Sequence, residues 1–190
     1  MTELIDAVKA CDAERVARML DADASLLSAG DQNGVSAVLL AMYHGKPAIA
    51  QLFIDRGAEL DLHEAAATGR LERVRELAAA ADVNTAGADG FQPLGLACYF
   101  GHEDVARFLL SAGADVKLAS KNAMQVQPIH AATARRSASI VKLLLENGAD
   151  PNAGQQMGYT PMDAARQNGD REIMDLLSAH GARDRPATGQ

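Results

Sequence analysis

Apolar residues recur at intervals of three and four in six short segments of the chain, and each segment predicts a helix with one buried face. The segments are VARML (16–20), IAQLFI (49–54), VREL (74–77), VARFLL (105–110), IVKLLL (140–145) and IMDLL (173–177). Four of them are followed by a glycine, an alanine and a polar residue, within 56–59, 112–115, 147–150 and 180–183. Glycine just after the last helical turn is typical of a left-handed C-cap. The pattern therefore predicts six similar helices with similar ends.

A shorter helical pattern precedes each of these segments, so the predicted unit is a pair of helices. Pro93, Pro128 and Pro161 suit the first turn of this earlier helix, where no backbone donor is needed. The earlier pattern opens with a tetrad of residues, such as QPIH at 127–130. The fourth position of this tetrad falls at residues 5, 39, 63, 95, 130 and 163, at intervals of 34, 24, 32, 35 and 33. Six residues later the copies carry Cys11, Gly45, Gly69, Gly101, Arg136 and Gly169. A fixed period of this length is the signature of a repeat protein.

Two stretches carry a family resemblance. Residues 92–115 (QPLGLACYFGHEDVARFLLSAGAD) and 160–182 (TPMDAARQNGDREIMDLLSAHGA) resemble the ankyrin repeat, whose pattern runs TPLH, AA, G, LLL and GAD. The resemblance covers roughly residues 3–184 and is to bacterial-type ankyrin repeat proteins of unassigned role. It implies an all-α ankyrin-repeat solenoid of about six stacked helix–turn–helix repeats with short projecting hairpins. Neighbouring repeats would complete one continuous core, because no repeat buries its apolar face alone.

The copies differ in ways that predict the domain organisation. We expect one ankyrin-repeat domain over residues 1–185, and a disordered tail at 186–190. The repeats fall at approximately 3–30, 31–60, 61–86, 87–119, 120–154 and 155–184. The first copy lacks the tetrad and is charged, as an N-terminal cap would be. The third is short by about nine residues of the usual 33, which predicts a gap in the row of hairpins. A two-repeat block followed by a four-repeat block is an alternative description.

Charge and composition exclude several classes of partner. The net charge is −7, and the sequence builds no continuous basic face of the kind that nucleic-acid binders carry. No apolar run reaches the length of a membrane-spanning helix, and the N-terminus lacks the pattern of a secretory signal. Cys11 and Cys98 are too far apart in sequence to form a zinc pattern or a disulfide framework. We therefore expect a cytoplasmic monomer that binds neither nucleic acid nor membrane.

The sequence offers little to support catalysis. It contains no HExxH, G-x-S-x-G, P-loop or G-x-G-x-x-G motif, so we expect no catalytic residue, no metal site and no cofactor. His63 and His130 occupy the tetrad position from which, by the resemblance, a histidine links its loop to the next through hydrogen bonds. An enzymatic alternative would place a site at the missing hairpin, near His44, His63 and Glu64. We expect a protein that is not an enzyme.

The aromatic residues give the most specific prediction. Phe53 and Phe108 lie on apolar stripes and are expected in the core. The resemblance implies that the other aromatic positions lie on the concave face, which varies with the partner. The predicted partner-binding residues are Tyr43, Phe91, Tyr99, Phe100, Met124, Val126, Arg135, Met157, Tyr159, Gln167 and Asn168. Exposed aromatic residues suit an interface hot spot. The alternative is that these aromatic side chains only pack between adjacent hairpins.

The resulting hypothesis is a non-enzymatic interaction module that binds a protein or peptide on its concave face. The alternative is an inhibitor or immunity-type protein that neutralises a partner enzyme. Lys117, Lys121, Arg135 and Arg136 form a small basic group near the fifth repeat, which would either steer an acidic partner or simply face solvent. The identity of the partner is not encoded in these patterns.

Overall fold

The computed structural model describes residues 2–183, and over that range it is all-helical, with no named strand. The α-helices are α1 (Thr2–Lys9), α2 (Ala13–Ala22), α3 (Ala37–Tyr43), α4 (Pro47–Asp55), α5 (Leu62–Ala67), α6 (Leu71–Ala78), α7 (Pro93–Phe100), α8 (Glu103–Ser111), α9 (Pro128–Ala134), α10 (Ala138–Glu146), α11 (Pro161–Gln167) and α12 (Arg171–Ala179). Two 3-10 segments, η1 (Ala24–Ser28) and η2 (Gln156–Gly158), lie between pairs. The expected tail at 186–190 lies outside the described residues.

The helices are six to ten residues long, and local signals define their ends. Side chains of Asp12, Ser36, Asp61 and Asp170 accept hydrogen bonds from backbone N–H groups in the first turns of α2, α3, α5 and α12. Proline opens α7, α9 and α11, as the sequence predicts. Isolated helices of this length are marginal in water, so packing against neighbouring repeats must supply most of their stability.

One hydrophobic core runs from Leu4 in α1 to Leu177 in α12. Its centre is made of small residues on the first helix of each pair, such as Ala66, Ala97 and Ala132, which let neighbouring helices approach closely. Phe53 is fully buried, as expected. Phe108 is half-buried: it packs against the core, and its ring centre lies 5.7 Å from the Arg75 guanidinium carbon, so it lies at the edge of the core and not inside it as expected.

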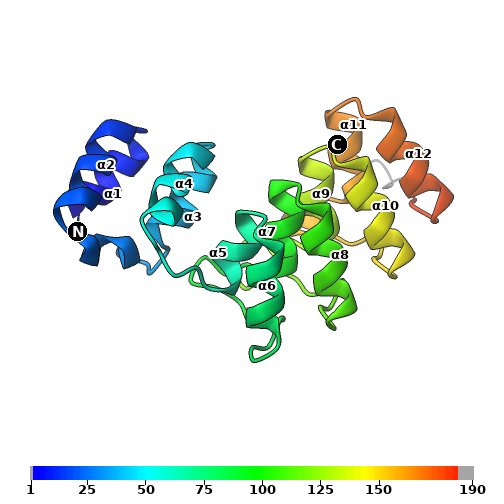
Figure 1. Cartoon of the computed structure of the whole chain (residues 1–190). Coiled ribbons are helices and arrows are strands. Elements are labelled where there is room, and N and C mark those ends of the chain that lie inside the picture. Colours follow the sequence, from blue (N-terminus) through cyan, green and yellow to red (C-terminus); the bar gives the residue numbers. More distant parts are fainter. Residues whose placement is uncertain (1, 184–190) are drawn as a thin grey trace.

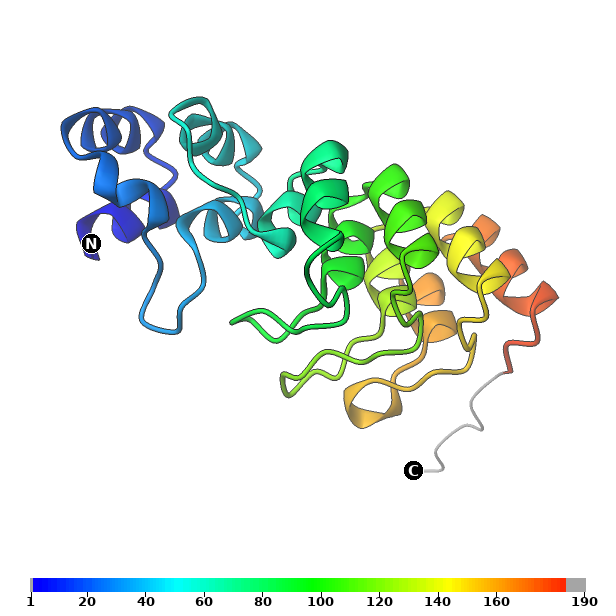
Figure 2. The ribbon, with the colours of Figure 1, turned by 60° about the horizontal axis from the view of Figure 1, so that its bottom comes forward.

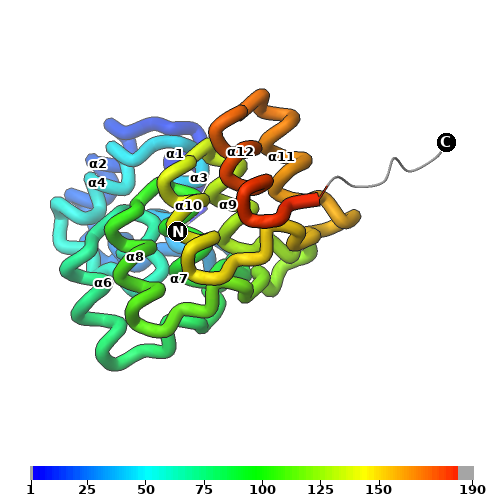
Figure 3. Tube along the Cα trace, turned by 90° about the vertical axis from the view of Figure 1, so that its right-hand side faces the viewer, coloured from blue at the N-terminus to red at the C-terminus, as the bar shows by residue number. Residues whose placement is uncertain are grey.

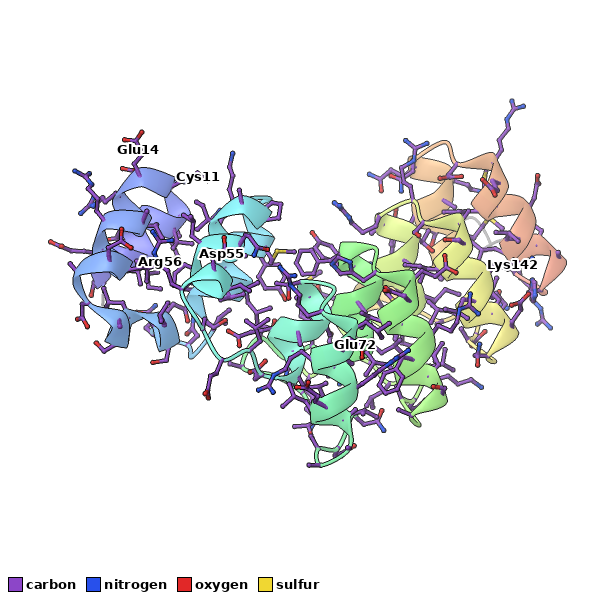
Figure 4. The ribbon with its side chains drawn as sticks, in the orientation of Figure 1. Cys11, Glu14, Asp55, Arg56, Glu72 and Lys142 are labelled. Atoms are coloured by element: carbon purple, nitrogen blue, oxygen red, sulfur yellow. The ribbon has the colours of Figure 1, made fainter. Side chains whose placement is uncertain are left out.

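The pairs stack side by side into an elongated solenoid (Figure 1). Figure 2 shows the connecting loops projecting from the same side of the helix stack, and Figure 3 shows the second helices following a curved path from α2 to α12. The second helices present charged side chains to solvent, among them Glu72 on α6 and Lys142 on α10, which Figure 4 labels. The stacking confirms the predicted ankyrin-like solenoid.

The projecting loops are called hairpins here, each numbered by the repeat that it enters. They are hairpin two (29–36), hairpin four (79–92), hairpin five (112–127) and hairpin six (147–160). Each is closed by a backbone hydrogen bond near its base, as from Gly87 N to the Phe91 carbonyl at 2.9 Å and from Ser120 N to the Val126 carbonyl at 2.9 Å.

No hairpin enters repeat three, as the short third copy predicts. Helix α4 ends at Asp55, and Asp61 already caps α5, so the chain passes directly between them. The α3–α4 pair is displaced from the α5–α6 pair (Figure 1). Between α4 and α6 lies an open groove of about 700 Å³, whose lining includes Ile54, Leu60 and Leu71. This seam divides the described chain into an N-terminal block (2–60) and a C-terminal block (61–183).

Successive loops of the C-terminal block are joined by side chains that bond to backbone. His63 and His130 each place Nε2 at 2.9 Å from a carbonyl oxygen of the following loop, that of Thr85 and of Ala153, which confirms the predicted linking role. Helix α5 begins one residue late, so Glu64 rather than His63 forms its capping box with Asp61. The histidine nevertheless reaches the next loop.

Repeat four has glycine at the histidine position, and a neighbouring side chain makes the equivalent link. Gln92 Nε2 donates to the Ala119 carbonyl at 3.2 Å. A second series of links uses asparagine: Asn84 bonds the Gly113 carbonyl and the Asp115 N–H, and Asn152 bonds the Gly181 carbonyl and the Arg183 N–H. The loops of this block are therefore held in fixed register.

Candidate functional site

Hairpins four, five and six form one continuous ledge because their backbones are hydrogen-bonded to each other. Lys121 N donates to the Gly90 carbonyl at 2.8 Å, and Gln156 N donates to the Met124 carbonyl at 3.1 Å. Gly90 has a φ of +84°, and a Cβ at that position would lie 2.8 Å from Asn122 N. Glycine is thus needed there both for the backbone angle and for the close approach of hairpin five.

Two neighbouring pockets lie in the corner between this ledge and the first helices α7, α9 and α11. The larger has a volume of about 250 Å³ and is lined by Phe91, Tyr99, Met124, Val126, His130, Ala131, Ala134, Gln155, Tyr159, Ala164, Gln167 and Asn168. The smaller has a volume of about 220 Å³ and is lined by Tyr43, Phe91, Leu96, Tyr99 and Met124. Phe91, Tyr99 and Met124 belong to both linings. We call the two pockets together the concave groove.

An aromatic cluster closes the N-terminal end of the concave groove. The ring of Tyr43 lies 6.3 Å from that of Tyr99 and 5.6 Å from that of Phe100, and the Tyr99 and Phe100 rings meet edge to face at 5.0 Å. The Tyr43 hydroxyl donates to Asp89 Oδ2 at 2.6 Å. Burial, together with the adjacent Asp89 carboxylate, raises the pKa of Tyr43. Tyr43 thus links the N-terminal block to hairpin four across the position of the missing hairpin.

The predicted residues differ in how far they are available to a partner. Phe100 is half-buried against Tyr43 and Tyr99 and lines neither pocket, so packing accounts for its position. Tyr99 remains 37% exposed and Met124 51% exposed, which leaves apolar surface facing solvent at the wall that the two pockets share. Tyr99 and Met124 are therefore the most exposed large apolar side chains of the concave groove.

Arg135 stands at the rim of the concave groove. Its guanidinium carbon lies 5.6 Å from the centre of the Tyr99 ring, a cation–π arrangement, and the residue is exposed. The neighbouring Arg136 has a different role, because its Nε lies 3.3 Å from Asp170 Oδ2. Arg135 thus lies against an aromatic ring, whereas Arg136 forms an ion pair.

The C-terminal wall of the larger pocket is polar but uncharged. The Tyr159 hydroxyl donates to Gln167 Oε1 at 2.5 Å, and Asn168 Nδ2 donates to the Thr133 carbonyl at 3.4 Å. Burial raises the pKa of Tyr159, with a further contribution from the nearby Asp163. These bonds fix the orientation of Tyr159 and Asn168 on the pocket wall.

Met157 lies apart from the concave groove, at the tip of hairpin six. Its side chain is 91% exposed, and it lines neither pocket. Its backbone has a φ of +62°, a conformation that favours glycine over methionine. The structure therefore separates this residue from the other predicted positions.

Several residues that line the concave groove were not predicted from the sequence. Gln155 on hairpin six, and Ala134 and Ala164 on α9 and α11, belong to the larger pocket. The alanines matter because their small side chains leave room between adjacent first helices. A signal was available in the sequence, since small residues recur near the C-terminal half of the first helices, but they read equally well as core.

The residues of the enzymatic alternative have other roles in the structure. His44 is exposed at the C-cap of α3, while His63 bonds the Thr85 carbonyl and Glu64 caps α5. Burial raises the pKa of Glu64, against the effect of hydrogen bonds from Ser36 and from the Asp61 backbone. Within residues 2–183, no group of three histidine, cysteine or acidic side chains is placed to hold a metal ion. No described helix is long and apolar enough to cross a membrane.

Comparison with known proteins agrees with this architecture. The family model for ankyrin repeats matches residues 62–120 and 117–185. The ankyrin repeat protein YahD of Escherichia coli (strain K12) is 31% identical over 167 residues, which span 80% of this chain and 83% of that protein. Cyclin-dependent kinase 4 inhibitor B of Rattus norvegicus is 32% identical over 124 residues, 65% of this chain and 94% of the inhibitor.

Other relatives are much longer than this chain. Ankyrin repeat and SOCS box protein 16 of Mus musculus is 37% identical over 115 residues, which cover 56% of this chain but 25% of that protein. The family match covers more than half of the chain and coincides with the C-terminal block. The protein therefore belongs to the ankyrin repeat family, whose repeats form protein–protein interaction modules.

Proposed function

We propose that the concave groove binds a segment of another protein and that the protein acts through this binding without catalysing a reaction. The observation that carries the proposal is the pair of adjacent apolar pockets whose shared wall keeps Tyr99 and Met124 exposed. Aromatic side chains in such positions are common hot spots of interfaces. The hydrogen-bonded ledge adds preorganisation, so that little conformational entropy is lost on binding.

The compartment and oligomeric state form a further part of the proposal. We place the protein in the cytoplasm as a monomer. The thiols of Cys11 and Cys98 are both free, which supports a reducing compartment. Size-exclusion chromatography with light scattering would test the monomeric state, and a dimer mass would contradict it.

Affinity capture with matched variants tests the binding proposal. Wild type, Tyr99→Ser and Arg107→Ser would be immobilised and exposed to lysate of the host. Arg107 is an exposed residue of α8, where it pairs with Glu103 at 2.7 Å, so it controls for general surface changes. We expect the partner to be retained by wild type and Arg107→Ser, and bound by Tyr99→Ser about thirtyfold more weakly, the effect of losing about 2 kcal/mol. Equal retention by Tyr99→Ser would contradict the site.

Phe100→Ser is unsuitable for this experiment. Phe100 packs against Tyr43 and Tyr99, so its removal would disturb the aromatic cluster and the fold together. The single Tyr99 variant separates binding from stability better than a double variant would.

An inhibitory role is the second candidate. It is favoured by the relative named cyclin-dependent kinase 4 inhibitor B, which is matched over nearly its whole length. If the captured partner is an enzyme, adding wild type should lower its turnover, and adding Tyr99→Ser should not. A partner whose turnover is unchanged at saturating wild-type protein would leave binding intact and exclude inhibition.

A further inference from the structure

We infer that the segment bound in the concave groove is a peptide with two apolar side chains, one for each pocket, and a carboxylate that meets Arg135. This inference rests on the proposed function and specifies the chemistry of its partner. It combines the size of the pockets, the character of their linings and the state of Arg135.

The pocket volumes favour single side chains as occupants. Pockets for small-molecule ligands usually measure about 300–1,000 Å³. The two pockets measure about 250 Å³ and about 220 Å³, so each alone is below this range, and the division of the space into two favours two separate side chains over one compact ligand. Because Phe91, Tyr99 and Met124 line both pockets, the two occupants would be neighbours across a thin wall, as two side chains of one peptide are.

The linings determine what kind of side chain fits. Aromatic rings, aliphatic side chains, methionine, neutral amides and the buried His130 line the two pockets, and neither lining contains an aspartate or a glutamate. The nearby Asp89 carboxylate lies outside both linings, where it accepts the hydrogen bond of the Tyr43 hydroxyl. Apolar side chains can enter such pockets without leaving a charge unpaired.

Arg135 supplies the charge selectivity. It makes no ion pair with another residue of the described range 2–183, whereas Arg136 beside it is paired with Asp170. The Arg135 guanidinium is held over the Tyr99 ring at the rim, so its position is defined before a partner binds. A carboxylate on the peptide would provide the missing counter-charge through a bidentate contact.

The experiment uses random dodecapeptides displayed on phage, selected on the wild-type protein and depleted on Tyr99→Ser. We expect the enriched peptides to share two apolar residues and an aspartate or glutamate. Synthetic versions with the acid and with its amide would then be titrated against wild type, Arg135→Gln and the control Arg107→Gln by fluorescence anisotropy. Losing either the acid or Arg135 should weaken binding about fivefold, without a further loss when both are absent. Arg107→Gln should leave the affinity unchanged.

Several outcomes would overturn the inference. Enrichment of basic peptides, or of apolar peptides without an acid, would contradict the assigned role of Arg135. Fully additive losses in the double variant would show that the acid and Arg135 do not interact. A selection that enriches no peptide would contradict a linear-peptide partner. None of these results would remove the proposed function, which fails only if Tyr99→Ser retains the lysate partner as wild type does.

Discussion

The junctions between repeats of the C-terminal block and the seam between the two blocks are held by different kinds of contact. Within the C-terminal block, His63, Gln92 and His130 bond backbone carbonyls of the following loops. Across the seam, most of the contacts join side chain to side chain, as between Tyr43 and Asp89 at 2.6 Å and between Ser36 and Glu64, and one joins Arg73 Nε to the Leu60 carbonyl at 3.2 Å. Backbone acceptors sit at positions that the repeat itself fixes, whereas a contact between two side chains depends on both residue identities.

This difference shows how a solenoid can continue where a repeat is incomplete. Repeat three brings no hairpin, and Tyr43 of repeat two reaches past it to hairpin four and to the rings of repeat four. The same Tyr43 lines the smaller pocket. The seam therefore lies directly beside the candidate site. We expect the seam to be less stable than the junctions between repeats of the C-terminal block.

The largest expected effect concerns the close hairpin contact of the C-terminal block. Gly90→Ala should cost about 3 kcal/mol, because a Cβ would lie 2.8 Å from Asn122 N in addition to the unfavourable φ of +84°. Gly101 has the same φ but no neighbour within 4 Å of a Cβ, so Gly101→Ala should cost only about 1 kcal/mol. Urea unfolding followed by circular dichroism measures both. Equal costs would show that the close approach of Asn122 to Gly90 adds no steric penalty.

The next effect concerns the seam. Tyr43→Phe removes the hydrogen bond to the Asp89 carboxylate and should cost about 1–2 kcal/mol. Hydrogen exchange should then show a larger loss of protection in α3 than in α9. Tyr159→Phe is the matched control, because its hydroxyl bonds Gln167 within one repeat, and it should leave the seam unchanged. A uniform loss of protection over both blocks after Tyr43→Phe would remove the distinction between them.

The two junctions should also respond to pH in opposite directions. Burial lowers the pKa of His130 from its ordinary 6.5. Just below pH 6.5 the unfolded state therefore binds more protons than the native state, so the free energy of unfolding falls as the pH is lowered through this range. Burial raises the pKa of Glu64 from 4.5, so the native state binds more protons just above that pH, and stability falls as the pH rises through this window. We therefore expect the free energy of unfolding, measured between about pH 4 and 8, to fall less on acidification in His130→Gln than in wild type. In Glu64→Gln it should fall less than in wild type as the pH rises.

His130→Gln gives the decisive comparison in this pH experiment. If His130→Gln kept the full wild-type acid sensitivity, the buried imidazole would not be its source.

The smallest expected effect compares one position in both blocks. Cys11 and Arg136 have φ values of +60° and +59° where other copies carry glycine. Cys11→Gly and Arg136→Gly should each stabilise the protein by up to about 1 kcal/mol, less what their side-chain contacts contribute. For Arg136 that loss is the exposed pair with Asp170, worth about 0–1 kcal/mol. Thermal unfolding would measure the change, and destabilisation of both variants would contradict the strain argument.

The sequence predicted the helix pairs, the missing hairpin and the linking histidines because these follow from period, length and residue type. It did not predict that Tyr43 would bond Asp89, since the two are 46 positions apart and the contact exists only because a hairpin is absent between them. The groove residues were proposed from family positions, and the structure places most of them around two pockets. It separates Met157 from them and buries half of Phe100, because hairpin conformation and ring packing are set by tertiary contacts.

The most direct test of the concave groove is hydrogen exchange on the complex with the captured partner. We predict new protection in residues 86–92, 119–127 and 155–160 and in the adjoining first helices, and much less of it when Tyr99→Ser replaces wild type at the same protein concentrations. Protection confined to α6, α8 and α10, on the opposite side of each helix pair, would contradict the site.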